Sequence, residues 1–269
     1  MNRESILLAS LQKQSKALEF GALDRPLIDK RQHSVKYVDF TDRESLAAKL
    51  VDTEGVVIDK LVEVDIVWQG TGFCESLGAY KPIDFVVASH VFEHLPNPLG
   101  WLETLAPVLS KKGCISLAIP DKRYTFDHAR SSTPTSEWVA AKLENRSVPP
   151  VNLALEAVMY FTPVETQCAW GNRYPDRKLL APEMFEHYLG LAKGILADGV
   201  YHDIHCSVFT PYSFAELMLE TAYYGLHEYS FSDFFPTRQG DMEFFVHLVV
   251  CDDRERQLSR WAALLHQLG

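Results

Sequence analysis

Apolar runs of strand length alternate with helix-like segments between residue 16 and about residue 127. Five of these runs are predicted strands, at residues 17–20, 35–40, 64–68, 83–89 and 114–120. The last two are almost continuously apolar, which is typical of parallel strands covered by helices on both faces. Repeated strand–helix–strand order of this length predicts a doubly wound parallel sheet with right-handed connections.

Leucines between the last two of these strands follow helical spacing, at positions 99, 102, 105 and 109. Lys111 and Lys112 precede Gly113. Basic residues followed by glycine are typical of a helix end, so the pattern predicts a helix that stops at Gly113.

The pattern changes between about residue 128 and residue 206, where proline and tryptophan are frequent and no clear strand is visible. This stretch predicts a helical insertion after the fifth strand. The chain then resumes with a helix at 210–225, which Thr210 caps and Pro211 begins. Two further predicted strands, joined by a turn, and an amphipathic helix follow, at 227–235, 243–251 and 253–269.

Together these elements predict an α/β chain with one domain over residues 1–269. Its core would comprise residues 16–127 and 207–269, with the insertion of about 128–206 on the substrate side. The expected architecture is a mostly parallel, doubly wound, seven-stranded sheet that finishes in an antiparallel hairpin.

Composition narrows the class of protein. The 269 residues are 47% hydrophobic and 23% charged, as in a globular chain, and the net charge of −10 argues against a nucleic-acid partner. Five widely spaced cysteines without a CxxC pattern predict reduced thiols. No apolar stretch approaches about 18 residues, so we expect a cytoplasmic protein without a membrane partner. The sequence leaves the oligomeric state open.

The short stretch "ALEFGALDRP" places Gly21 directly after the first predicted strand. Ligands of open α/β sheets bind where strands end, near the first strand. A dinucleotide would require further glycines beside its pyrophosphate, and no GK[ST] motif for a phosphate loop occurs. S-adenosylmethionine has an adenosine without phosphates, so one glycine turn suffices. Asp39, eighteen residues later at the end of the second strand, suits its ribose hydroxyls, whereas a plain tight turn is the alternative.

The segment "IDFVVASHVFEHLPNPLGWLETLAPVLSKKGCISLAIP" resembles the central region of class I S-adenosylmethionine-dependent methyltransferases. The segments "DKRYTFDHARSSTPT" and "FTPYSF" resemble a subgroup found in bacterial surface-glycan and glycosyltransferase contexts. Two features depart from the family pattern. The GxGxG turn is reduced to Gly21-Ala22-Leu23, and "WQGTGF" replaces the usual acid after the third strand.

The resemblance implies roles for residues at the strand ends. Glu19 would brace the turn or contact the methionine amino group, and Asp39 would bind the ribose. The other implied cofactor-binding residues are Gly21, Ala22, Gly70, Thr71, Ser89 and His90. For Glu93 and His94, which start a predicted helix and can cap it, a structural role is favoured over a functional one.

Methyl transfer to a hydroxyl requires alignment of the acceptor and removal of its proton, for which histidine is a natural base. The candidate catalytic residues are His90, His202 and His205. His202 and His205 could also form half of a metal site, or simply pack. Because neither an HExxH motif nor a carboxylate companion is visible, we expect no metal.

The basic run after the fifth strand offers candidate substrate-binding residues, namely Lys122, Arg123 and Arg130. Guanidinium groups match phosphate, carboxylate and sugar-nucleotide anions. The alternative is a solvated loop whose cations pair internally with Asp121 and Asp127.

The sequence therefore predicts an S-adenosylmethionine-dependent methyltransferase that acts on a hydroxyl of a small molecule or sugar. Methylation of a nitrogen or carboxyl group is an alternative. The reduced glycine motif leaves open a degenerate, non-catalytic partner domain of a glycosyltransferase. The missing glycines disfavour a nicotinamide-dependent oxidoreductase.

Overall fold

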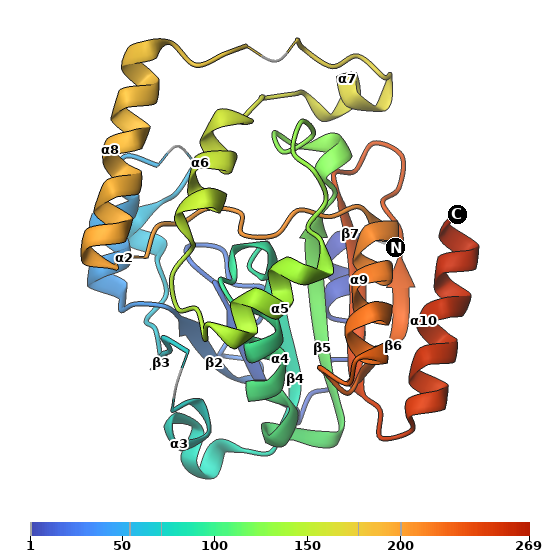
Figure 1. Cartoon of the computed structure of the whole chain (residues 1–269). Helices are drawn as coiled ribbons and strands as arrows, with labels where there is room; N and C mark the ends of the chain where they lie inside the picture. Colours follow the sequence, from blue (N-terminus) through green and yellow to red (C-terminus); the bar gives the residue numbers. More distant parts are fainter. Residues whose placement is uncertain (1, 54, 71, 177, 200) are drawn as a thin grey trace.

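The core of the protein is a sheet in the order β3-β2-β1-β4-β5-β7-β6 (Figure 1). The structure, a computed structural model, describes residues 2–53, 55–70, 72–176, 178–199 and 201–269. Within these residues the first five strands are parallel, and β7 is antiparallel to both β5 and β6. The strands are β1 (Lys16–Phe20), β2 (Ser34–Asp39), β3 (Ile66–Val67), β4 (Ile83–Ser89), β5 (Leu109–Pro120), β6 (Tyr229–Phe235) and β7 (Glu243–Val250). The predicted sheet and its final hairpin are thus confirmed.

Helices connect and cover these strands. The α-helices are α1 (Arg3–Leu7), α2 (Arg43–Leu50), α3 (Phe73–Leu77), α4 (Pro98–Leu105), α5 (Thr135–Leu143), α6 (Val151–Met159), α7 (Thr166–Trp170), α8 (Pro182–Asp198), α9 (Pro211–Tyr223) and α10 (Arg254–Leu268). Five 3₁₀ helices are described, η1 (Ile58–Lys60), η2 (Gly78–Tyr80), η3 (Phe92–His94), η4 (Ala106–Val108) and η5 (Lys122–Tyr124). None of the helices in the described ranges is long and apolar enough to cross a membrane.

Alternation along β4 divides the core into two faces, because successive side chains of a strand point to opposite sides. Val86 and Ala88 belong to a large cluster with buried residues of α4, α9 and α10. Phe85 and Val87 belong to a second cluster, which includes Ile6 of α1. Both faces of β4 are therefore buried, as its continuous apolar run predicts.

The helix after β4 ends earlier than expected. α4 stops at Leu105, η4 follows, and β5 already begins at Leu109, so Gly113 lies inside the strand and not at a helix end. Pro107 has no N–H with which to continue the helical hydrogen bonds, which explains the early stop. In contrast, the predicted start of α9 is confirmed, because Thr210 and Ser213 form a reciprocal capping box.

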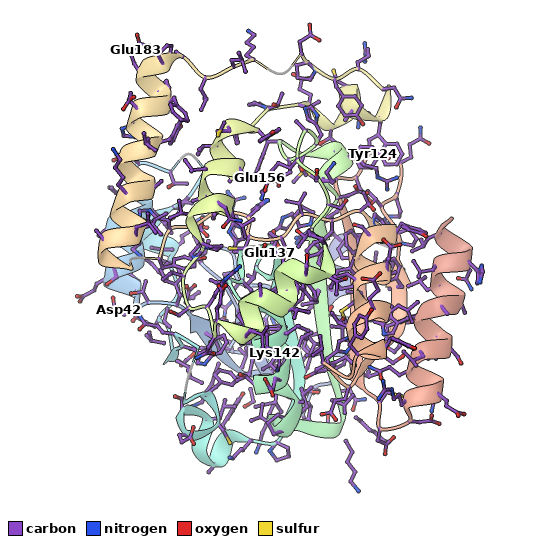
Figure 2. The ribbon with its side chains drawn as sticks, viewed as in Figure 1. Asp42, Tyr124, Glu137, Lys142, Glu156 and Glu183 are labelled. Carbon is purple, nitrogen blue, oxygen red and sulfur yellow. The ribbon has the colours of Figure 1, made fainter. Side chains whose placement is uncertain are left out.

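In chain order, helices α5 to α8 follow β5 and precede α9, as predicted for the segment after the fifth strand. Trp138 of α5 is buried in the large core cluster, so α5 packs with the core layer. Figure 1 shows α6 and α7 beyond the carboxyl end of β5. Tyr124 is attached to this region, because its ring stacks on Trp170 of α7 at a centroid distance of 4.0 Å (Figure 2).

Candidate functional site

The carboxyl ends of β1, β2, β4 and β5 meet at one edge of the sheet, since these strands are parallel neighbours. β7 runs in the opposite direction, so its first residue reaches the same edge, where Glu243 pairs with Pro120. Ligands of open α/β sheets bind at such an edge. The predicted site residues can therefore be located relative to it.

Gly21 makes the turn after β1 with a φ of +65°. Its N–H donates to the Val38 carbonyl at 3.0 Å, and an added Cβ would lie 2.6 Å from Val91 Cγ2. The position therefore requires glycine both for conformation and for space. Ala22 is buried and packs in the core cluster below α1.

Glu19 braces the loop that follows this turn. Its two carboxylate oxygens accept the N–H groups of Leu27 and Ile28 at 2.7 and 2.9 Å. Burial raises the pKa of Glu19 to about 7, although these hydrogen bonds act in the opposite direction. Of the two roles expected for Glu19, its contacts in this structure are those of the brace.

Asp39 ends β2 beside the Gly21 turn. Its Oδ1 accepts the N–H of Phe40 at 2.8 Å, and burial raises the pKa of this carboxyl to about 6. The Phe40 ring contacts Tyr201 at a centroid distance of 4.7 Å, so the segment that returns from α8 covers the end of β2. Gly70 follows β3 at an exposed position with a φ of +95°. Thr71 lies outside the described residues.

Ser89 and His90, at the end of β4, are joined to two residues that the sequence did not predict. Arg3 of α1 donates from Nη2 to Ser89 Oγ at 2.5 Å and from Nε to Glu243 at 2.6 Å. His90 has a φ of +54°, and its Nε2 lies 2.8 Å from Glu243. No motif surrounds Arg3 or Glu243 in the sequence, and only the topology of β7 brings Glu243 to this edge.

His90 is held as a cation at neutral pH. Burial alone would lower its pKa, but the carboxylates of Glu243 and Glu93 outweigh that effect and raise the pKa to about 9. Glu93 lies 3.5 Å from His90 Nδ1. In this arrangement His90 already carries a second ring proton and acts as a hydrogen-bond donor. It therefore suits the binding of a negatively charged group better than the removal of a proton from a substrate.

A second group of residues converges beside His90. His205 Nδ1 lies 2.5 Å from the buried carboxylate of Asp127, and His94 Nδ1 lies 2.8 Å from Asp203. The two imidazole rings are perpendicular at a centroid distance of 4.6 Å. Glu93, which is fully buried, lies 3.9 Å from His94 Nε2.

The expected helix-capping role of Glu93 and His94 is wrong. These residues belong to η3, which has no side-chain cap, and the cap of α4 is Asn97. The chain turns toward the edge before α4 begins, so Glu93 points to the histidines and not to free helix N–H groups. His202, by contrast, is half-buried, and within the described part of the chain it has no hydrogen bond or ion pair.

The cations of the basic run have internal partners. Arg123 forms a two-pronged interaction with Asp121, with its shortest N–O distance at 2.6 Å, and 47% of its side chain is exposed. Lys122 donates to the His128 carbonyl at 3.1 Å, and burial lowers its pKa. These contacts match the alternative of internal pairing, but they leave Arg123 accessible from solvent.

Arg130 is fully enclosed, with 1% of its side chain exposed. It donates to Asp127 and to the His205 carbonyl, both at 3.0 Å, and to Glu156 of α6 at 3.3 Å. Figure 2 labels Glu156 on α6, and this contact ties that helix to the group around His205. Arg130 therefore positions His205 and Asp127 and does not face solvent.

Comparison with known proteins places these features in a family. Residues 3–228 match the model of a family described as "Methyltransferase domain". No curated protein matches the chain. The match spans α1, the carboxyl ends of the five parallel strands and α9, whereas β6 and β7 lie beyond it.

Several solved structures are similar over most of the chain. One, from Rhodobacter sphaeroides, is described as a zinc-dependent alcohol dehydrogenase, with 14% identity, 92% and 88% coverage of this chain and its own, and a TM-score of 0.49. A methyltransferase from Methanosarcina mazei has 13% identity, 92% and 98% coverage, and a TM-score of 0.43. The glycopeptide N-methyltransferase MtfA, in complex with sinefungin, has 13% identity, 90% and 89% coverage, and a TM-score of 0.43.

These structural scores are all below 0.5, so the assignment rests on the family model, which covers well over half of the chain. The glycine turn, the acid at the end of β2 and the strand order agree with it. The chain belongs to the methyltransferase-domain family and is an S-adenosylmethionine-dependent methyltransferase.

Proposed function

We propose that this protein transfers the methyl group of S-adenosylmethionine to a hydroxyl of a small molecule or sugar. The observation that carries the proposal is the convergence of His94, His205 and Glu93 beside the cofactor edge. Such a buried polar group suits a substrate that has a proton to lose and an oxygen to be held.

The residues at the edge fit S-adenosylmethionine. Gly21 makes the left-handed turn at the end of β1, where the missing side chain leaves room for Val91, and we assign the methionine end of the cofactor to this turn. Asp39 Oδ2 has no hydrogen bond within the described residues, and it is available to the ribose hydroxyls. We propose that Gly70, Thr71, Ser89 and His90 complete this binding surface, with Glu19 and Ala22 supporting the turn.

S-adenosylmethionine, when bound, supplies a methyl carbon on a positively charged sulfur, so the C–S bond breaks as the new O–C bond forms. The task left to the protein is to orient the acceptor oxygen and to take up its proton. His205 is oriented by Asp127, whose contact occupies Nδ1 and leaves Nε2 outside that contact. We assign proton removal from the acceptor to this cluster, with His202 and His90 at its border.

Recognition of the acceptor is assigned to the basic run. Arg123 follows β5, and 47% of its side chain is exposed although it pairs with Asp121. Lys122 lies next to it and is partly buried. These two cations suit an acceptor that carries an anionic or strongly polar group. Arg130 acts indirectly, by holding Asp127 and His205 in place.

The proposal is tested by incubating the protein with a metabolite extract and S-adenosylmethionine that carries a trideuterated methyl group. Fragmentation mass spectrometry then locates the label in the product. We expect label on an oxygen, and a fall in kcat of roughly 10²–10⁴-fold in His205→Ala. Calorimetric affinity for S-adenosylhomocysteine should not change in that variant.

His266→Ala, an exposed histidine on α10, is the control and should retain the full rate. Label on nitrogen or on a carboxyl group would replace the assigned acceptor atom with one of the alternatives. An absence of binding of S-adenosylhomocysteine would instead support a non-catalytic partner domain.

A further inference from the structure

The strongest unassigned feature of the protein is the interior of the cluster formed by Glu93, His94 and His205. One ligand atom from each of these side chains lies within 4.8 Å of the others. Both Glu93 oxygens lack a hydrogen bond within the described residues, although the side chain is completely buried. A buried carboxylate without hydrogen bonds is costly unless a cation compensates it.

His90 is the nearest cation, but it does not satisfy Glu93. The distance of 3.5 Å from His90 Nδ1 is long for a charged hydrogen bond, and His90 Nε2 is already paired with Glu243 at 2.8 Å. His94 Nε2 lies 3.9 Å from Glu93 Oε1, and one ring nitrogen of His205 lies within 4.8 Å of the ligand atoms of both residues. Their approach brings two imidazoles and one carboxylate to a common point.

The contacts of the two histidines outside the cluster also favour a metal site. Nδ1 of His205 is held by Asp127, and Nδ1 of His94 is held by Asp203. Metal-binding histidines almost always have their second ring nitrogen fixed by a carboxylate or carbonyl in this way. Such contacts favour the tautomer that carries its proton on Nδ1 and its lone pair on Nε2.

A further layer holds these carboxylates. Arg130 donates to Asp127 at 3.0 Å and to the carbonyl of His205 at the same distance. Tyr201 donates to Asp203 at 3.2 Å. The orientation of both imidazoles is therefore determined from outside the cluster, as in a preorganised ligand set.

We propose that Glu93, His94 and His205 bind a divalent transition-metal cation of the zinc class. Two imidazoles and one carboxylate leave a fourth position open, which is the ligand set of catalytic zinc sites. Zinc bonds of about 2.0–2.2 Å require ligand atoms roughly 3.4 Å apart. His94 Nε2 and Glu93 Oε1 lie 3.9 Å apart, so small side-chain rotations are enough to form the shell.

This site also deepens the proposed function, on which the following consequence rests. A cation held by these three side chains would favour ionisation of an acceptor hydroxyl bound at its open position. The acceptor proton would pass to solvent, and no electron transfer is required. The sequence led us to expect no metal, because the companions of His205 come from Glu93 and His94, far away in the chain.

The test measures metal directly. Protein freed of metal with a chelator is dialysed against zinc, and the bound metal is counted by mass spectrometry and titrated against a competing chromophoric chelator. We expect one zinc ion per chain in the wild type. Glu93→Gln and His205→Ala should weaken zinc binding at least a hundredfold, whereas Asp127→Asn should weaken it by roughly 10–100-fold through the outer contact.

His202→Ala is the matched control, because it removes a neighbouring histidine that lies outside the cluster, and it should keep one zinc ion. Since Glu93→Gln could disturb folding, cobalt is also added to the wild type. Visible absorption typical of a tetrahedral nitrogen and oxygen site supports the proposal. Wild type that binds no zinc, or variants that bind it as tightly as wild type, would overturn it.

The same samples separate this inference from the proposed function. If metal-free protein methylates a hydroxyl at an unchanged rate, the proposed role of the metal is rejected and the proposed function is retained. One bound zinc ion together with label found only on nitrogen retains the metal site and rejects the hydroxyl acceptor.

Discussion

Arg3 Nε lies 2.6 Å from Glu243 Oε1, which joins the first helix of the protein to the first residue of its last strand. Arg3 also contacts Ser89 at the end of β4. The side chain of Arg3 is 42% exposed, whereas that of Glu243 is 11% exposed. This contact therefore fixes α1 at the edge of the sheet to which we assign the cofactor.

We expect Arg3→Gln to lower the free energy of unfolding by about 1 kcal/mol, because the charged hydrogen bonds are partly screened by solvent. Hydrogen exchange of residues 3–7 should become faster. Arg31→Gln is the control, since the Arg31 side chain is 89% exposed and loss of its pair with Asp29 should leave the stability close to that of the wild type. Equal exchange rates in wild type and Arg3→Gln would show that α1 is held by its apolar face alone.

Affinity for the cofactor should depend on pH through Asp39. Burial raises the pKa of this carboxyl to about 6, with a smaller contribution from Asp203 and opposing effects of the Phe40 N–H and Lys49. The ribose hydroxyls need the ionised form, which predominates above that pKa and is lost as the pH falls. The dissociation constant for S-adenosylhomocysteine should therefore rise about tenfold between pH 7 and pH 5.

Asp39→Asn is the matched variant for this measurement. It should weaken binding at pH 7 by roughly tenfold to a hundredfold, since a charged hydrogen bond contributes about 1.5–3 kcal/mol. The pH dependence should then be nearly flat. If the variant retains the full pH dependence, another group, such as Glu19, controls it.

Gly21→Ala should reduce both stability and cofactor affinity. The positive φ costs an alanine roughly 1–2 kcal/mol, and the new Cβ would force Val91 to move. Gly225→Ala introduces the same conformational cost at a φ of +71°, where the nearest atom lies 3.7 Å away and the cofactor edge is remote. Chemical denaturation and calorimetry should show destabilisation in both variants and weaker S-adenosylhomocysteine binding only in Gly21→Ala. Wild-type affinity in Gly21→Ala would reduce this position to an ordinary turn.

The two arginines of the basic run should respond differently to loss of charge. Arg130→Met removes the guanidinium from the buried Asp127, which then keeps only His205 as a partner, and we expect it to cost about 3–5 kcal/mol in urea denaturation. Arg123→Met removes a half-exposed group and should cost less than about 1 kcal/mol while raising KM for the acceptor. Similar losses of stability in both variants would contradict the separation of a positioning residue from a substrate-binding one.

Much of the fold could be predicted because local signals determine it. The apolar runs that became β4 and β5 are buried on both faces, and the capping residues of α9 are adjacent in sequence. The helix after β4 was predicted too long, because leucine spacing continued through Pro107, whose missing N–H ends the helix.

The site was only partly predictable, because its contacts join distant segments. Gly21 and Asp39 lie at strand ends that a pattern can locate. Arg3 and Glu243 have no local signal, and their role depends on the antiparallel direction of β7. Glu93 and His94 looked like capping residues, and only the return of the chain at His205 gives them partners.

The position of β7 also has a consequence for the order in which the molecule forms. β6 precedes β7 in the chain, but within the described sheet it pairs only with β7, which itself pairs with β5. β6 therefore has no neighbour in the sheet until a strand synthesised after it has been inserted. Pairings between such distant segments form slowly. A growing chain that ends before Glu243 would hold the parallel strands while leaving Arg3 and His90 without the carboxylate they share, so the cofactor edge is completed among the last steps of folding.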